Sequence, residues 1–168
     1  SGEVGEAANS LGKWLKSGGF SEAESAPDGD AAEARFLAEP RIVFQLRKGV
    51  LWQDGAPFSS DDVRFTYEAI MDDAVASPRK PDFTLIREIE TPGPHEVRVR
   101  YRKPYAPALN SWRMSIIPAH ILRGKSPEWW SENFNRRPAG TGPFRFGEWR
   151  TNEYLRLVRS ENYWRAPG

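Results

Sequence analysis

The chain has 168 residues, 28% of them charged, and a formal net charge of +1 that argues against a dominant polyanion partner. It contains no cysteine, which excludes disulfides and thiolate metal sites, and no apolar run approaches the ~20 residues that a membrane-spanning helix needs. A chain of this length can bury about 70% of its unfolded surface in a single core.

The first forty residues differ in composition from the rest. They carry eight acids and three bases, whereas residues 41–168 carry fifteen acids and twenty-one bases. Residues 21–35 are small, acidic and nearly free of large apolar side chains, so burial cannot offset the entropy lost on ordering them. We therefore divide the chain into an N-terminal segment, 1–40, with a mobile acidic loop at about 21–35, and a folded domain, 41–168.

The folded domain is predicted to begin with a strand, a tight turn and a helix. Residues 42–46 alternate between apolar and polar at the period of a half-buried strand. Asp54-Gly55 is a turn dipeptide, and Ser59 or Ser60 can cap a helix whose Asp61-Asp62 pair suits the positive end of the helix dipole. The helix is expected to end near Asp72-Asp73, and its apolar residues at helical spacing are Val63, Tyr67, Ile70 and Met71.

The rest of the chain alternates between short strands and short helices. The predicted elements, in order, are strands 84–90 and 96–101 joined by a Thr91-Pro92-Gly93-Pro94 turn, a helix over 105–112, a strand over 114–117, helices starting at Pro118 and Pro127, and a closing hairpin of strands 144–149 and 154–159. This order predicts an α+β domain with a mainly antiparallel sheet and helices packed against it.

Two blocks of sequence resemble the family 5 extracellular solute-binding proteins, which include the dipeptide-, oligopeptide- and nickel-binding components of ABC importers. The first block runs from Phe44 to Glu68, FQLRKGVLWQDGAPFSSDDVRFTYE. The second begins with PAGTGPF at 138–144 and closes with Asn162-Tyr163-Trp164. The resemblance covers roughly residues 41–168 and implies one lobe, or part of one, of a two-lobed periplasmic binding protein that closes over its ligand.

The resemblance also implies a function without covalent chemistry. We expect a substrate-binding component that captures peptides or similar small solutes and delivers them to a membrane permease, with no cofactor, no enzyme activity and no nucleic-acid partner. The expected location is the periplasm, or the cell surface as a lipoprotein, and the expected state is a monomer. Because such receptors are several hundred residues long, we expect this chain to be an excised portion or a naturally short relative.

Two stretches are placed near the ligand cleft by the same resemblance. The first lies between Arg79 and Phe83, where flanking prolines favour an irregular loop, and the second follows Asn110. Arg113 is a candidate contact for an anionic group of the ligand. The candidate ligand-binding residues are Arg79, Phe83, Trp112, Arg113 and Met114.

The glycine-rich turn Gly140-Thr141-Gly142 is predicted to be structural. It precedes a proline and a strand rather than a helix, so it lacks the N–H cradle that a helix N-terminus offers to phosphate. We expect at least one of its glycines at positive φ, with a Gly142→Ala cost of about 1–3 kcal/mol.

Other chemistries compete poorly with structural explanations. His95 and His120 lack any metal-binding spacing, and we expect no metal site. Arg98, Arg100 and Arg102 share one strand face, which we interpret as a solvated outer face. The seven tryptophans leave one alternative open, a stand-alone carbohydrate-binding module, whereas an enzyme would need a nucleophile–base pair that the sequence does not offer.

Overall fold

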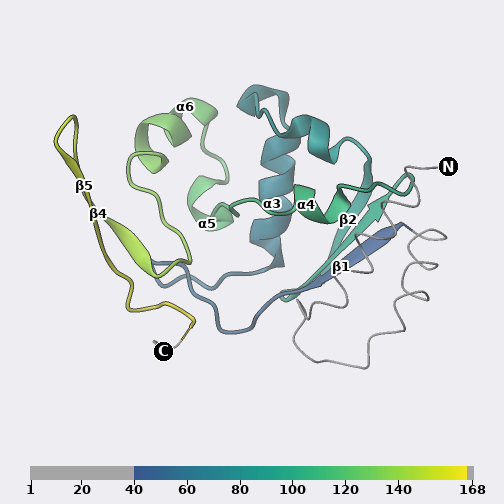
Figure 1. Ribbon diagram of the computed structural model, residues 1–168, viewed down its shortest axis with the longest axis horizontal. Helices are drawn as coiled ribbons and strands as arrows, with labels where there is room; N and C mark the ends of the chain where they lie inside the picture. Colours follow the sequence, from purple (N-terminus) through teal and green to yellow (C-terminus); the bar gives the residue numbers. More distant parts are fainter. Residues whose placement is uncertain (1–39, 166–168) are drawn as a thin grey trace. The chain divides into compact units, whose positions relative to one another are not determined.

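The structure is a computed structural model that describes residues 40–165 (Figure 1). Expectations for residues 1–39, including the acidic loop at 21–35, lie outside the described residues. The chain divides into two compact units, and each contains segments that are distant in sequence. Among the described residues, the first unit holds 40–44, 78–90 and 98–114, and the second holds 45–77, 91–97 and 115–165.

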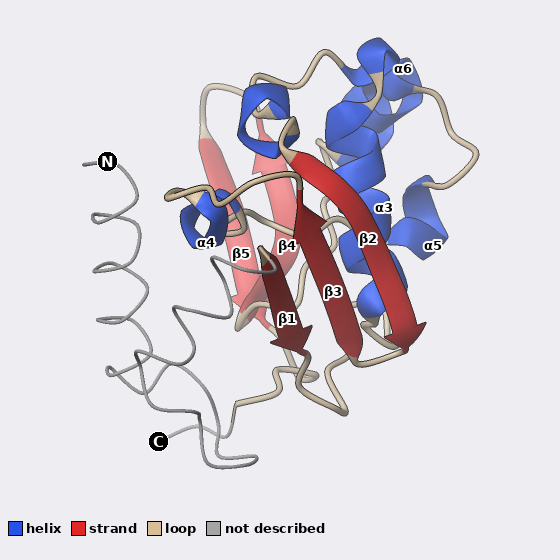
Figure 2. Ribbon diagram, turned by 90° about the vertical axis from the view of Figure 1, so that its right-hand side faces the viewer, coloured by secondary structure: helices blue, strands red, loops and turns tan. Residues whose placement is uncertain are grey.

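A three-stranded sheet is formed by β1 (Arg41–Gln45), β3 (Glu96–Tyr101) and β2 (Ile86–Gly93), in that spatial order (Figure 2). The predicted alternation along β3 is confirmed. Val97 and Val99 are fully buried, whereas Arg100 is exposed and lies within ion-pair distance of Glu88 and Glu90 on β2. Arg100, the middle arginine of this face, is therefore paired with acids of the neighbouring strand.

The hairpin between β2 and β3 is tighter than predicted. The proline-rich run 91–94 was expected to form the turn, but β2 continues to Gly93 and the turn consists of Pro94 and His95. Pro92 is tolerated within a strand because β2 lies at the edge of the sheet, where every second N–H points away from the neighbouring strand.

The second unit is built around helix α3 (Ser60–Met71). Two shorter helices, α5 (Ala119–Leu122) and α6 (Pro127–Trp129), lie on one side of it in Figure 1. The helix was predicted, but its buried stripe differs. The fully buried apolar residues are Val63, Phe65 and Ala69, while Tyr67, Ile70 and Met71 are half-buried. The cluster around Phe65 comprises Ala119, Leu122, Ile117, Ile121, Trp129, Trp130 and Phe134.

Short helical turns fill the remaining connections. They are η1 (Asp73–Val75), η2 (Lys80–Phe83), α4 (Ala108–Ser111) and η3 (Trp130–Phe134), so the helix expected over 105–112 is only one turn long. The strand predicted over 114–117 is wrong, because the N–H of Ile117 donates to the hydroxyl of Thr66 at 3.0 Å rather than to a ladder. None of the helices between residues 40 and 165 has both the length and the hydropathy of a membrane span.

The closing hairpin was predicted correctly. Strands β4 (Phe144–Arg150) and β5 (Tyr154–Arg159) are antiparallel, with Asn152 at positive φ in the turn between them. The register shifts between Phe146 and Glu148, which leaves Gly147 as an extra residue. This bulge places Trp149 on the same face as Phe146, because without it the indole would point to the opposite side.

Gly147→Ala is expected to destabilise this hairpin. A Cβ on Gly147 would lie 2.9 Å from the carbonyl oxygen of Arg156, a backbone atom that cannot rotate away. The expected cost is about 1–3 kcal/mol, seen as faster amide exchange across β4 and β5. Gly93→Ala is the matched control, because a Cβ there meets nothing within 4 Å. Unchanged exchange in Gly147→Ala would contradict the assigned bulge geometry.

Candidate functional site

The first unit brings together the two stretches that were expected near a ligand. A guanidinium nitrogen of Arg79 donates to the backbone oxygen of Ser111 at 2.9 Å, and the same group lies 3.4 Å from the carboxylate of Asp82. The ring of Phe83 packs edge-on against Trp112 with centroids 5.3 Å apart. The stretch 79–83, predicted as an irregular loop, forms the helical turn η2, and it makes one cluster with the segment after α4.

The indole of Trp112 is held in place within this cluster. Its Nε1–H donates to the hydroxyl of Tyr101 at 2.9 Å, and its ring lies 5.4 Å from that of Phe44. Trp112 as a residue is half-buried, and its ring packs against those of Phe44 and Phe83. Because its polar atom is satisfied within the protein, the ring itself offers only apolar contacts.

The five candidate residues differ in exposure. Arg113 is exposed, and Arg79, Trp112 and Met114 are half-buried. Phe83 is completely buried, so its side chain packs beneath Trp112 and has no surface of its own to offer a ligand. The cluster can offer guanidinium groups and a fixed aromatic ring, which suit a ligand that has both an anionic and an apolar group.

Sequence reasoning did not assign Tyr101 and Ser111 to this cluster. The alternation along 96–101 predicts that Tyr101 points inward, but only the tertiary structure places its hydroxyl against the indole. Ser111 contributes a backbone oxygen, which carries no signal in the side-chain sequence.

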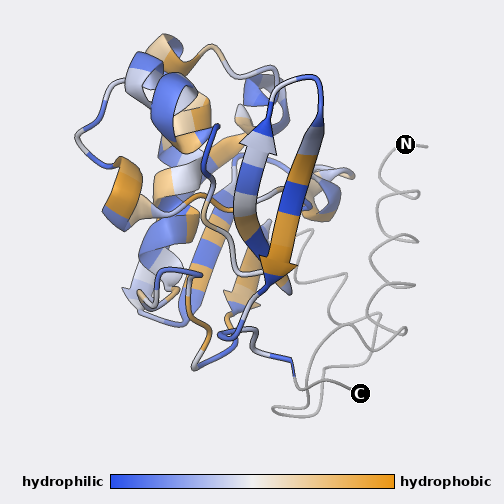
Figure 3. Cartoon of the chain, turned by 90° about the vertical axis from the view of Figure 1, so that its left-hand side faces the viewer, coloured by the Kyte–Doolittle hydropathy of each residue, from blue (hydrophilic) through white to orange (hydrophobic). Residues whose placement is uncertain are grey.

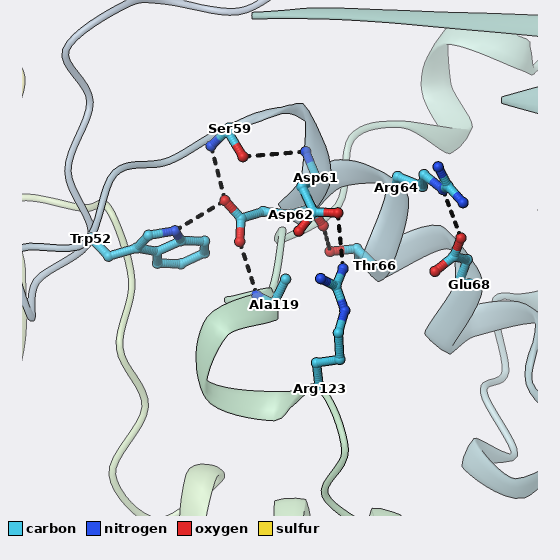
Figure 4. A network of polar contacts seen from close by, with 9 residues as sticks. All are labelled: Trp52, Ser59, Asp61, Asp62, Arg64, Thr66, Glu68, Ala119 and Arg123. Carbon is cyan, nitrogen blue, oxygen red and sulfur yellow. Dashed lines mark hydrogen bonds and ion pairs between the residues drawn. The ribbon is translucent and has the colours of Figure 1, made fainter. Parts of the chain in front are cut away.

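The second unit is organised by the carboxylate of Asp62, which is almost fully buried (Figure 4). One of its oxygens accepts from Trp52 Nε1 at 3.2 Å and from the N–H of Ser59 at 2.9 Å. The other accepts from the N–H of Ala119 at 2.9 Å. Ser59 and Asp62 form a capping box, as the serine and acid spacing suggests. Compensation of the helix dipole is thus only part of the role of Asp62, which joins three segments.

The neighbouring polar residues extend this frame. The hydroxyl of Thr66 donates to the backbone oxygen of Asp62 at 2.7 Å, and that of Ser60 donates to the oxygen of Gly93 at 2.7 Å. Asp61 is exposed and forms an ion pair with Arg123 at 2.9 Å (Figure 4). These contacts are internal to the protein, so the two aspartates are satisfied without a ligand.

The turn at 140–142 is held by a side chain that sequence reasoning missed. The amide of Gln53 accepts from the N–H of Gly140 at 2.9 Å and donates to the oxygens of Gly142 at 3.2 Å and Phe144 at 2.7 Å. The expectation of a glycine at positive φ is wrong, because neither Gly140 nor Gly142 adopts it. A Cβ at Gly142 meets nothing within 4 Å, so the predicted cost of Gly142→Ala loses its basis as well.

His120 pairs with Asp54 from the turn before α3. Its Nε2 lies 2.7 Å from a carboxylate oxygen of Asp54, and its ring lies 6.2 Å from that of Trp52. Burial raises the pKa of Asp54, but the hydrogen bonds with His120 and with the N–H of Ala56 lower it. Together the hydrogen bonds outweigh the effect of burial, so the pKa of Asp54 lies below its ordinary value. His120 thus stabilises the ionised form of Asp54.

Comparison with known proteins gives a consistent result. Residues 38–168 match the model of the bacterial extracellular solute-binding proteins, family 5 middle. The oligopeptide-binding protein AppA of Bacillus subtilis is 34% identical over 125 residues, which cover 71% of this chain and 23% of that protein.

Solved structures agree with the sequence match. NikZ from Campylobacter jejuni in complex with Ni(L-His) superposes with a TM-score of 0.68 at 33% identity, over 74% of this chain and 25% of that one. The structure of AppA from B. subtilis with a nonapeptide gives a TM-score of 0.63 at 29% identity, over 73% of this chain and 25% of that one. The chain therefore spans about a quarter of the length of these relatives.

Asp62→Ala is expected to lower the free energy of unfolding by about 3 kcal/mol. The substitution leaves the N–H groups of Trp52, Ser59 and Ala119 without their acceptor, and such buried donors are costly. Urea denaturation measures the loss. Asp61→Ala is the control, since its exposed ion pair should contribute less than about 1 kcal/mol. Equal effects of the two variants would contradict the role given to Asp62.

His120→Ala is expected to have a pH-dependent effect. The folded-state pKa of Asp54 lies below the unfolded value of 3.8, so its contribution to stability is present above 3.8 and disappears as the pH falls through the folded value. The deficit of His120→Ala relative to the parent should therefore be larger at about pH 6 than at about pH 3. Urea unfolding at both values tests this, and a constant deficit would show that the Asp54 pair contributes nothing.

Proposed function

We propose that this chain, which belongs to the family 5 bacterial extracellular solute-binding proteins, forms part of the receptor of an ABC importer that captures peptides or similar small solutes. The match of residues 38–168 to the family carries the proposal. Its relatives are binding proteins, one solved with a nonapeptide and another with a nickel–histidine complex. Peptides are the favoured class, because backbone hydrogen bonds and an aromatic surface serve side chains of varied size.

The first unit supplies one wall of the ligand cleft in this proposal. Arg113 and Arg79 attract an anionic group of the ligand, and the ring of Trp112 covers its apolar part, with Met114 alongside. Phe83 acts indirectly by supporting the indole from below. Guanidinium groups recognise carboxylates through paired hydrogen bonds, and such a bond to a charged group is typically worth about 1.5–3 kcal/mol.

The proposed mechanism is closure of two lobes over the ligand, followed by docking of the closed receptor onto a membrane permease. The receptor itself performs no covalent chemistry. It acts outside the cytoplasm, in the periplasm or as a lipoprotein at the cell surface, and it works as a monomer. The second unit, with its internally satisfied aspartates, provides a rigid frame in this scheme.

A carbohydrate-binding module is the second candidate, and the two differ in what the isolated chain can bind. A quarter of a receptor offers one wall of a cleft, so it gains neither two-sided burial nor closure. Calorimetry of the 168-residue chain should show no binding tighter than about 1 mM for a peptide, an oligosaccharide or nickel–histidine. Micromolar binding of the oligosaccharide by this chain would favour the module instead.

The site residues are tested in a protein of the relatives' length that contains this chain. Arg113→Ala should weaken the binding of a carboxylate-bearing peptide about tenfold or more, in keeping with the loss of one charged hydrogen bond. Arg87→Ala, which removes another exposed arginine of the first unit, should leave the affinity unchanged. If both variants bind as the parent does, Arg113 has no role in ligand capture, whatever the function of the whole protein.

A further inference from the structure

The hairpin β4–β5 has one apolar face and one polar face. Cross-strand partners share a face, and the pairs Phe146–Leu157 and Trp149–Leu155 lie on the same side. Phe144 joins them, two residues before Phe146. The opposite side carries a polar cluster, in which Glu148 accepts from Arg150 at 3.1 Å and from the hydroxyl of Tyr154 at 3.0 Å. Figure 3 shows the resulting alternation of hydrophobic and hydrophilic residues along the strands.

The apolar face is uncovered within the described residues. Phe144 is 60% exposed, Trp149 53%, Leu155 57% and Leu157 53%. Single exposed apolar residues are ordinary, but four large ones side by side on one face mark a contact surface. The bulge at Gly147 strengthens this reading, since it is the feature that brings Trp149 onto the face that Phe146 and Leu157 occupy.

A hairpin of two strands also has too little burial to be stable by itself. Isolated two-stranded sheets are marginal in water, and three strands or a packed partner are normally needed. Within residues 40–165 no third strand joins this sheet, although the amide of Gln53 donates to the oxygen of Phe144 at 2.7 Å. The hairpin therefore needs a further layer packed on its apolar face to be stable, and residues 40–165 do not provide that layer.

We propose that this face is a packing surface for the part of the receptor polypeptide that lies outside this chain. The chain spans about a quarter of the length of its relatives, so a family-length protein holds about three times as many further residues that could cover it. The covering segment should be apolar, with an acidic residue near Arg159, which lies directly across from Phe144. The proposal rests on family membership and not on the ligand or the transport role.

The test uses single cysteines, because the chain has none of its own. Leu157→Cys reports on the apolar face and Arg156→Cys, the matched control, on the polar face of the same strand. Both positions are exposed, so neither change disturbs the core. The rate of reaction with a thiol reagent is measured in the 168-residue chain and in a protein of the relatives' length, with any other cysteine there replaced by serine.

Both cysteines should react at similar rates in the 168-residue chain. In the longer protein, Leu157→Cys should react at least about tenfold more slowly while Arg156→Cys keeps its rate. Amide exchange over residues 144–159 of the unsubstituted proteins provides a second measurement and should slow in the longer protein.

Three results would overturn the proposal. Fast labelling of Leu157→Cys in the longer protein would show that nothing covers the face. In the 168-residue chain, labelling of Leu157→Cys that becomes slower as the protein concentration rises would identify a second copy as the occupant. Slow labelling there at every concentration would place the cover within this chain. None of these results bears on ligand binding, so the proposed function is judged separately.

Discussion

The carboxylate of Asp62 is the contact on which the second unit depends. It is almost completely removed from water, yet it accepts hydrogen bonds from three N–H groups that belong to three separate segments. A buried carboxylate is costly unless such donors surround it, and the donors would in turn be costly to bury without this acceptor. The start of α3, the segment around Trp52 and the start of α5 are thereby tied into one arrangement, and the apolar cluster around Phe65 forms beneath it.

The same principle recurs with a different side chain at the glycine-rich turn. Gln53 has one acceptor and two donor hydrogens on its amide, and it uses both kinds on the backbone of residues 140–144. Its own N–H adds a bond to the oxygen of Gly140 at 2.9 Å. The turn thus obtains from one distant side chain the hydrogen bonds that a strand would receive from a neighbour. The described glycines at positive φ are Gly49, Gly55 and Gly124, none of which belongs to this turn.

The two units present different kinds of surface. In the second unit, the polar side chains at the start of α3 are satisfied internally, which suits a supporting role. In the first unit, Trp112 is fixed by Tyr101 and Phe83, and the next residue in the chain, Arg113, is exposed. An immobilised ring loses little further freedom when a ligand binds, so this fixed indole is compatible with the proposed role of the first unit.

The sequence by itself determined the elements with strong local signals. The capped helix after Ser59, the alternation along β3 and the hairpin β4–β5 all follow from periodicity, capping and turn residues, which act over a few positions. The family was recognisable for the same reason, because its two blocks are contiguous stretches.

The tertiary structure decided what depends on partners distant in the chain. It extended β2 through Pro92, since edge position rather than local preference determines whether proline fits. It removed the strand at 114–117, because Thr66 competes for the N–H of Ile117, and it assigned to Asp62, Gln53 and Tyr101 contacts that no local pattern encodes. The contact between the stretch 79–83 and Trp112 also depends on tertiary structure, because the two segments are distant in the chain. Local propensities act within a few residues, whereas a buried polar group takes whichever partner the folded chain brings to it.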